Sequence, residues 1–173
     1  ALSHTTYWKY DRFYHSGDKS RSDNANYWGG TVKGGVNYNI NKYHKVFLNT
    51  GFISRAPYFK SGAFMSATSS NVINDMAENE KSATLEIGYG FHNEYFSLGV
   101  NGYLTEWLDK SMTKKGKLVE QYYINMTGVN SCHMGVEVEF KGRPTRWVEM
   151  TAMLALGDWK WTSDNVKGYA YNL

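Results

Sequence analysis

The chain has 173 residues, a length that fits one ordinary domain. Lys and Arg number 19 and Asp and Glu 16, so the formal net charge of +3 is too small for the basic surface of a duplex-binding protein. Cys132 is the only cysteine, which excludes an internal disulfide. The combination of 14 Tyr, 17 Gly and only 2 Pro favours many long β-strands over a helical domain.

The sequence also limits the ways in which the chain can meet a membrane. It begins without the basic start and apolar run of a signal peptide, so none is expected. No stretch approaches the roughly 18 consecutive apolar residues of a transmembrane helix, and no lipidation motif is visible. A membrane role is therefore expected only through a β-barrel or a surface contact.

Apolar and polar residues alternate with a period of two along most of the chain, as in strands with one apolar and one polar face. This pattern predicts about seven strands: Thr5–Tyr14, Tyr27–Ile40, Lys45–Arg55, Ser82–His92, Tyr95–Lys110, Ser131–Phe140 and Arg146–Trp161. Short polar turns are expected at Asn41–His44, His92–Glu94 and Lys141–Thr145. Long polar loops are expected at His15–Ala25, Pro57–Lys81, Ser111–Asn130 and after Trp161. This order predicts an all-β, antiparallel up-and-down meander.

Alternation alone does not say which medium the apolar face meets. In a soluble sandwich or small barrel this face packs inward, whereas in an outer-membrane barrel it faces lipid. Three features favour the membrane: a polar face rich in Gly, Asn, Thr and Glu, strands longer than the usual five or six residues, and aromatic residues near strand ends. We therefore expect the strands to form part of a larger transmembrane β-barrel.

Several stretches, taken in order, resemble the barrel of TonB-dependent outer-membrane receptors, particularly those of Bacteroides-type bacteria. They are Thr31–Ile40, Val46–Phe52, Ser54–Pro57, Asn79–Lys81, Leu85–Tyr89, Gly128–Asn130, Gly135–Glu139 and Gly157–Trp161. The resemblance covers the chain from about Thr5 to Trp161. It implies a barrel of about 22 strands around an N-terminal plug domain. It also implies energised import of a scarce nutrient (a siderophore, vitamin, glycan or peptide) across the bacterial outer membrane.

The chain departs from that family in having no plug domain and about a third of the strands. We therefore expect residues 1–173 to be an interior piece of a receptor barrel. The resemblance implies three partners: membrane lipid, the TonB system acting through the absent plug, and, in some relatives, an outer-membrane lipoprotein. No nucleic-acid partner is expected.

The polar face supplies the candidate site residues. Residues expected to face the lumen are Lys33, Asn37, Asn49, Glu86, Asn101, Glu137, Glu139 and Glu149. Candidates for ligand contact are Arg55, Tyr58, Phe59, Trp107, Trp159 and Trp161. For Arg55 a structural pairing is favoured over contact with an anionic ligand or the plug. For the three tryptophans anchoring at the membrane interface is favoured over stacking on sugar rings. The loops Pro57–Lys81 and Ser111–Asn130 are candidates for contact with the ligand or a partner.

No set of residues points to catalysis or to a cofactor. None of the five histidines has a partner at metal-ligand spacing, and Cys132 has no CxxC partner. Glu137 and Glu139 share a face, but a polar lumen wall is favoured over acid–base chemistry or calcium binding. We expect no enzyme, metal or cofactor. Two alternatives stay open: a soluble antiparallel barrel or sandwich that binds a small ligand, and an adhesin-like surface protein that binds through its loops.

Overall fold

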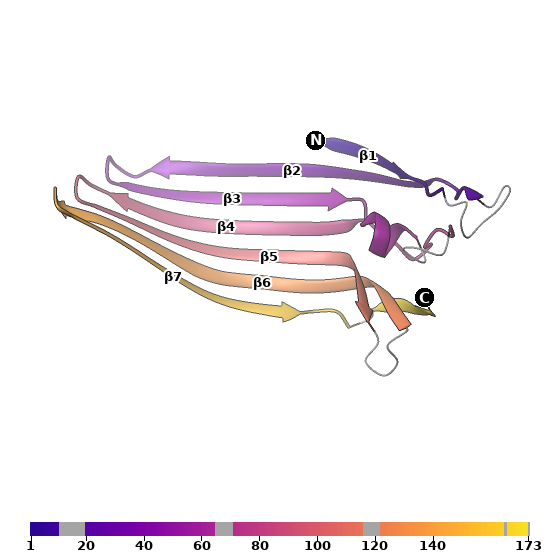
Figure 1. The fold of residues 1–173 in the computed structure, drawn as a ribbon. Helices are drawn as coiled ribbons and strands as arrows, with labels where there is room; N and C mark the ends of the chain where they lie inside the picture. The colour runs from indigo at the N-terminus through magenta and orange to yellow at the C-terminus, as the bar shows by residue number, and fades with distance from the viewer. Residues whose placement is uncertain (11–19, 65–70, 116–121, 165, 173) are drawn as a thin grey trace.

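The computed structural model describes residues 1–10, 20–64, 71–115, 122–164 and 166–172. These residues form a single β-sheet (Figure 1). Its strands are β1 (Leu2–Tyr7), β2 (Ala25–Asn39), β3 (His44–Arg55), β4 (Glu80–His92), β5 (Phe96–Lys115), β6 (Tyr122–Thr145), β7 (Val148–Trp161) and β8 (Lys167–Asn172). A one-turn π-helix, η2 (Phe59–Ala63), lies between β3 and β4 in the chain.

The strands from β1 to β7 are arranged side by side in chain order, and each is antiparallel to the next. The predicted up-and-down meander of seven strands is therefore confirmed. The short strand β8 pairs with the first residues of β6, which β7 does not reach. The sheet is open, because β1 and β7 lie at opposite edges of the strand order.

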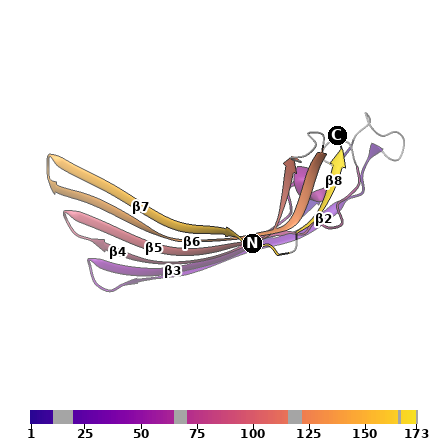
Figure 2. The ribbon, with the colours of Figure 1, turned by 90° about the horizontal axis from the view of Figure 1, so that it is seen from below.

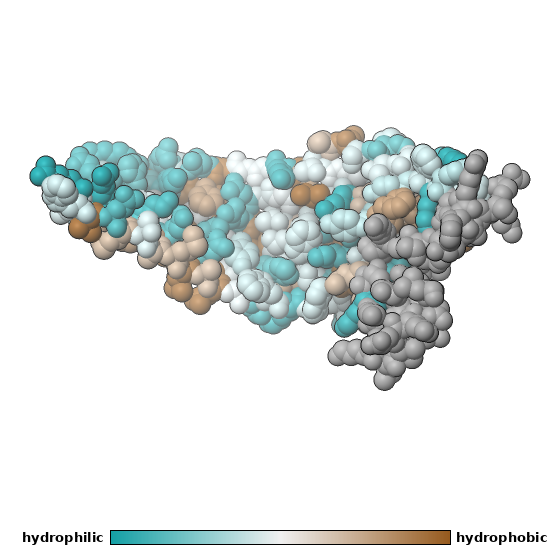
Figure 3. Space-filling model, viewed as in Figure 1, coloured by the Kyte–Doolittle hydropathy of each residue, from teal (hydrophilic) through white to brown (hydrophobic). Residues whose placement is uncertain are grey.

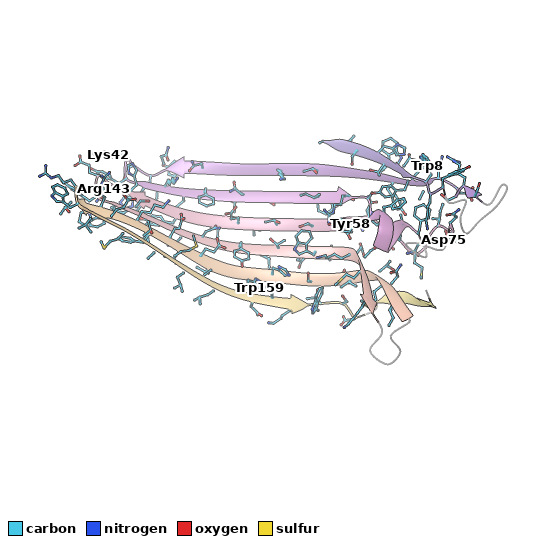
Figure 4. All side chains as sticks on the ribbon, in the orientation of Figure 1. Trp8, Lys42, Tyr58, Asp75, Arg143 and Trp159 are labelled. Carbon is cyan, nitrogen blue, oxygen red and sulfur yellow. The ribbon has the colours of Figure 1, made fainter. Side chains whose placement is uncertain are left out.

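The two ends of the sheet differ in their connections (Figure 1). At the short-turn end, β2 joins β3, β4 joins β5 and β6 joins β7 through two to four residues. Lys42 and Arg143 lie at this end (Figure 4). The loop end carries the long connections, including the segment between β3 and β4 that contains η2.

Several predicted boundaries were wrong. The predicted turn Lys141–Thr145 is the end of β6, and the chain turns at Arg146 and Trp147 instead. The predicted loop Ser111–Asn130 is largely paired, since β5 continues to Lys115 and β6 begins at Tyr122. The polar tail after Trp161 contains β8. Ser111–Lys115 and Lys141–Thr145 contain few apolar residues. In Tyr122–Thr127 burial is inverted, because the polar Asn125 and Thr127 are buried and the apolar Ile124 is exposed. Residues 11–14 of the first predicted strand lie outside the described residues.

One face of the sheet carries an apolar belt. Its members, placed on this face by the strand register, are Val32, Val36, Tyr38, Val46, Leu48, Phe52, Leu85, Ile87, Tyr89, Phe91, Leu98, Val100, Leu104, Met134, Val136, Val138, Phe140, Met150, Leu154 and Leu156. None of these side chains is buried, and Ile87 is 62% exposed. The belt is therefore not a packed core within the described part of the chain.

Buried side chains gather instead at the loop end. Pro57, Ala63 and Phe64 come from the segment that carries η2, and Asn125 and Val129 come from the first half of β6. The ring of Phe59 packs edge-on against Phe64 at 5.1 Å and against Tyr7 at 5.6 Å. This part of the molecule therefore has a small core of its own, formed where the β3–β4 segment folds back onto the sheet.

The sheet bends sharply near the loop end, and η2 lies inside the curve (Figure 2). At the same level, the pairing of β5 with β6 shifts in register between Trp107 and Met112. Asp109 has a φ of 57° and Gly128, on β6, a φ of 76°. β-Bulges with residues in such conformations bend a strand and increase its twist. The irregular pairing explains why the C-terminal part of β5 and the N-terminal part of β6 leave the plane of the sheet.

Candidate functional site

The face opposite the belt, called here the polar face, brings the candidate lumen residues together. Because side chains alternate between faces, the strand register assigns each residue to one face. It places on the polar face all eight residues expected to line a lumen: Lys33, Asn37, Asn49, Glu86, Asn101, Glu137, Glu139 and Glu149. Seen from this side, hydrophilic and neutral residues dominate the middle of the sheet (Figure 3).

Glu86 lies at the centre of a polar network on this face. One of its carboxylate oxygens accepts a hydrogen bond from Asn49 Nδ2 at 3.2 Å, and the other accepts one from Asn101 Nδ2 at 2.7 Å. The three residues belong to β3, β4 and β5, so the network ties three neighbouring strands together. Each carboxylate oxygen of Glu86 therefore accepts a hydrogen bond from an amide donor of a neighbouring strand.

Glycines on the polar face make room for long side chains of the neighbouring strands. A Cβ atom on Gly88 would overlap the ring of Phe47, and one on Gly135 would lie 2.7 Å from the Tyr103 hydroxyl oxygen and 2.5 Å from a backbone oxygen of Leu156. The aromatic rings therefore lie along the sheet rather than standing away from it. This packing gives a local reason for the many glycines of this face.

A cluster of rings, called here the aromatic patch, lies on the polar face toward the loop end. It consists of Tyr103, Trp107, His133, Trp159 and Trp161, from β5, β6 and β7. Trp159 Nε1 donates a hydrogen bond to the Tyr103 hydroxyl at 3.3 Å, and the His133 and Trp159 ring centroids are 6.2 Å apart. Figure 4 shows the place of Trp159 near the end of β7.

Trp107, Trp159 and Trp161 lie toward the loop end of their strands, on the face opposite the belt. Their register neighbours on β6 are Ser131 and His133, on the polar face, so their rings are on the opposite side from the belt. An interfacial ring would have to lie on the lipid side. Anchoring of Trp107, Trp159 and Trp161 at a membrane interface stays a prediction, and it requires lipid on the face opposite the belt. Trp28, which faces the belt side beside His4, has the geometry that such a role needs.

The other three ligand-contact candidates belong to the loop end. The Arg55 guanidinium pairs with the Glu80 carboxylate at 2.7 Å and also donates a hydrogen bond to the Tyr58 hydroxyl at 3.0 Å. Glu80 is 2% exposed, and its second carboxylate oxygen accepts a hydrogen bond from the Ser111 backbone N–H. The hydrogen bond to Glu80 raises the pKa of Arg55 above its usual value, against the smaller effect of burial.

This arrangement gives Arg55 the structural ion pair that the sequence favoured. The ion pair between Arg55 and Glu80 joins the end of β3 to the start of β4. The hydrogen bond from the Ser111 N–H to Glu80 connects both to the C-terminal part of β5. Phe59 is engaged with Tyr7 and Phe64. The Tyr58 side chain is exposed, and the Arg55 guanidinium lies over its ring at 4.9 Å from the centroid.

Sequence reasoning missed Tyr103 and His133 as members of the aromatic patch. A signal for both was available: Tyr103 falls between Gly102 and Leu104, and His133 between Cys132 and Met134, so strict alternation assigns both to the polar face. Their proximity to Trp159 depends on the register between strands, which alternation within one strand does not give.

Among the described residues, no group of three or more His, Cys, Asp and Glu side chains has a geometry that fits a metal ion. The part of the chain that the structure describes also contains no helix long and apolar enough to cross a bilayer. Comparison with known proteins finds no matching family model, no matching curated protein and no matching solved structure.

Proposed function

We propose that this chain is a wall segment of an outer-membrane import receptor of the TonB-dependent type, with its belt toward lipid and its polar face toward an aqueous lumen. The observation that carries this proposal is the exposed apolar belt opposite a continuous polar face. A sheet in water would bury such a belt, because every Å² of exposed apolar surface is unfavourable.

The height of the belt fits a bilayer. On β4 the belt runs from Leu85 to Phe91, and Ala83 precedes it on the same face, so the apolar stretch spans nine residues. Strands of 9–11 residues cross the hydrocarbon region when tilted. Nine residues extend about 30 Å along a strand and about 20 Å along the membrane normal at a 45° tilt, close to the roughly 25 Å apolar band of such barrels.

Charged residues follow the belt on the same face toward the loop end. Lys81 forms an ion pair with Asp109 at 2.7 Å, and Lys160 pairs with Asp158. Glu106 faces the same side, two residues beyond Leu104. A lipid-facing surface that ends at the headgroup region has this change from apolar to charged residues.

The open edges of the sheet support a larger assembly. In lipid an unpaired backbone N–H or C=O costs several kcal/mol, so β7 and the uncovered part of β2 both require a neighbouring strand. Further strands of the same receptor would supply them and close the barrel. The stretches between Thr31 and Trp161 that resemble TonB-dependent receptors, taken in their order along the chain, support this type of barrel. The resemblance also implies a plug that contacts TonB and, in some relatives, a lipoprotein partner.

In this proposal the chain acts by binding and gating rather than by catalysis. The soluble alternative would need the belt to be covered, whereas the buried apolar side chains of the described residues lie at the loop end. Nothing in the described geometry favours the adhesin-like alternative over the receptor.

Fractionation of the source cells tests the proposal. An antibody raised against the polar segment from Asn71 to Glu80 should detect a band in the outer-membrane fraction that is much larger than a 173-residue chain and migrates differently after heating in detergent. Uptake through the receptor should stop when the proton gradient that energises TonB is dissipated. Recovery of the antigen in the soluble fraction, at the size of this chain alone, would contradict the proposal.

A further inference from the structure

The three short turns gather exposed rings and cations at one end of the sheet (Figure 1). This end is called here the turn surface, and its members are Lys42, Tyr43, Glu94, Tyr95, Arg143, Arg146 and Trp147. Neighbouring turns are joined through the backbone, since the His92 N–H donates a hydrogen bond to the Tyr43 carbonyl at 2.9 Å. The Arg143 N–H likewise donates one to the Tyr95 carbonyl at 2.7 Å. A strand that pairs with β7 would lie beside it in the sheet and leave these turns accessible.

Two of the turns hold a tyrosine in the same way. Asn41 Oδ1 accepts a hydrogen bond from the backbone N–H of Tyr43 at 2.8 Å. Asn93 Oδ1 accepts one from the backbone N–H of Tyr95 at 2.9 Å. Such Asx turns fix the local backbone, so each tyrosine has a defined place at the end of the sheet. Both side chains are exposed there.

Cations lie over two of the exposed rings. Lys42 Nζ is 4.7 Å from the Tyr43 ring centroid, and the Arg146 guanidinium carbon is 4.6 Å from the Trp147 ring centroid. A ring face attracts a cation but offers it no oxygen acceptor, so the N–H donors of both side chains can still bind an anion. Trp147 is 79% exposed, and its ring is therefore also open to a ligand.

The charges of the turn surface differ from those at the loop end. At the loop end, cations on the belt side have carboxylate partners, as Lys81 has in Asp109 at 2.7 Å. Among the described residues, no carboxylate forms an ion pair with any of the three cations of the turn surface. Glu94 is the one acidic member, so three cations and one carboxylate give this surface a net charge of +2.

Aromatic rings lie between the belt and the turn surface. On the belt face, the His44 ring centroid is 5.0 Å from that of Phe91, and His44 Nδ1 is 2.6 Å from the Tyr89 hydroxyl oxygen. Phe96 and Phe140 stack with their centroids 6.0 Å apart. Apolar residues, then aromatic rings, then cations is the order that suits a passage from hydrocarbon into an anionic headgroup layer.

These groups match the headgroup of an anionic phospholipid. A phosphate diester accepts hydrogen bonds from Lys and Arg, and the planar Arg guanidinium binds two phosphate oxygens at once. The exposed rings beside the cations suit the boundary between headgroups and acyl chains. A zwitterionic headgroup carries its own cation and has no net charge, so unpaired Lys and Arg side chains favour the anionic lipid over it.

We propose that the turn surface binds the headgroups of anionic phospholipids in the membrane leaflet that meets the short turns. The inference goes beyond the proposed function, because it names a lipid partner at one end of the belt. It rests on that function for the placement of the belt in a bilayer. The observation that carries it is the difference between paired charges at the loop end and unpaired cations over exposed rings at the short turns.

Quenching of tryptophan fluorescence by brominated lipids tests this inference on the full chain reconstituted in vesicles. The two probes are phosphatidylglycerol and phosphatidylcholine, each brominated on its acyl chains and diluted into unbrominated phosphatidylcholine. Trp147 reports on the turn surface, because the other five tryptophans lie toward the loop end. Subtraction of the signal of Trp147→Phe, which keeps an aromatic ring, isolates its contribution.

Phosphatidylglycerol should be preferred at Trp147 about fivefold over phosphatidylcholine at low salt, the equivalent of about 1 kcal/mol. The combined variant Lys42→Gln, Arg143→Gln and Arg146→Gln should remove this preference, and the single variant Arg146→Gln should reduce it. The matched control loses three lysines of the loop end to glutamine, and should keep the preference: Lys110, Lys114 and Lys160. Salt at about 1 M should also remove it, because the Debye length falls to about 3 Å.

Equal quenching by the two lipids in the unaltered chain, or an equal loss of preference in the loop-end control, would overturn the inference and leave the receptor proposal standing. No quenching by either lipid would overturn both, because the belt would then not lie in a bilayer. A chain that ignores phosphatidylcholine vesicles but is recruited to phosphatidylglycerol vesicles through the same three cations would support the headgroup site and contradict the receptor.

Discussion

At the loop end of the molecule side chains are buried by other side chains, whereas over the body of the sheet both faces remain largely uncovered. Phe64 and Asn74 are almost fully buried at the loop end, while every residue of β7 is exposed. The first region follows the packing rules of a protein in water. The second has apolar side chains in number but no packed interior. The difference indicates that the sheet needs a medium or further strands to cover its belt, and the loop end does not.

The largest effect is expected from a substitution that disrupts the core of the loop end. Phe64→Ala should cost about 3–5 kcal/mol of local stability, because it leaves a cavity where a fully buried ring had been. Hydrogen exchange should speed up at the amides of Asn74 and Thr127, while amides in the middle of β3 and β4 keep their protection. Equal loss of protection throughout the sheet would show that the two regions fold as one unit.

A charge placed in the middle of the belt should cost nearly as much. Ile87→Arg should lower the free energy of unfolding in phospholipid vesicles by about 2–4 kcal/mol, the cost of arginine on the lipid face at the bilayer midplane. The control is Asn37→Arg, which changes an exposed residue of the polar face at a similar height. Denaturant titration measures both variants, and equal losses would contradict the assignment of the faces.

Removal of the ion pair at the base of the loop end should have a smaller effect. Arg55→Met leaves the buried Glu80 carboxylate with a hydrogen bond from the Ser111 N–H at 3.2 Å and without its ion pair. A hydrogen bond to a charged group contributes about 1.5–3 kcal/mol. The partial exposure of Arg55 places the expected loss at the lower end of this range. Proteolysis between β3 and β4 should become faster. An unchanged cleavage rate would show that Arg55 does not hold this segment.

An effect of similar size should come from adding a methyl group to a glycine of the polar face. Gly135→Ala puts a methyl group against a backbone oxygen of Leu156 and the Tyr103 hydroxyl, which overpacks the site by about 1–3 kcal/mol. Gly99→Ala is the matched control, because its added Cβ would meet only Glu139 at an ordinary 3.8 Å. Thermal unfolding of the two variants should separate them, with Gly135→Ala the less stable. Equal stability would mean that Tyr103 moves aside freely.

The sequence predicts the middle of each strand well and the ends poorly, for a physical reason. Between Leu85 and Phe91, or Met134 and Phe140, one face is apolar and the other polar, so alternation identifies the strand and its faces. Beyond the bend, the polar Asn125 and Thr127 are buried and the apolar Ile124 is exposed, so alternation there does not predict which face is covered. Boundaries there depend on what the β3–β4 segment covers, which no local pattern records.

The candidate site shows the same limit: the face of a residue can be predicted within one strand, whereas its contacts with other strands cannot. The eight lumen candidates share one face, as parity within each strand predicts, and their exposure to a lumen stays a prediction. The partners of Glu86 and the contact of Trp159 with Tyr103 depend on register between strands that are far apart in sequence. The pairing of Arg55 with Glu80 across the β3–β4 segment was expected only as an unnamed structural pairing.

The orientation of the two faces is tested most directly by spin labels placed one at a time along β4, from Thr84 to Tyr89, in a Cys132→Ser chain reconstituted in phospholipid vesicles. Labels at Leu85, Ile87 and Tyr89 should collide mainly with oxygen, which concentrates in lipid, and labels at Thr84 and Glu86 mainly with a water-soluble nickel complex. Gly88 is left unlabelled, because a side chain there would overlap the Phe47 ring. This account predicts that alternation with a period of two. Equal accessibility of both sets to the nickel complex, or protection of the belt positions from both reagents, would contradict it.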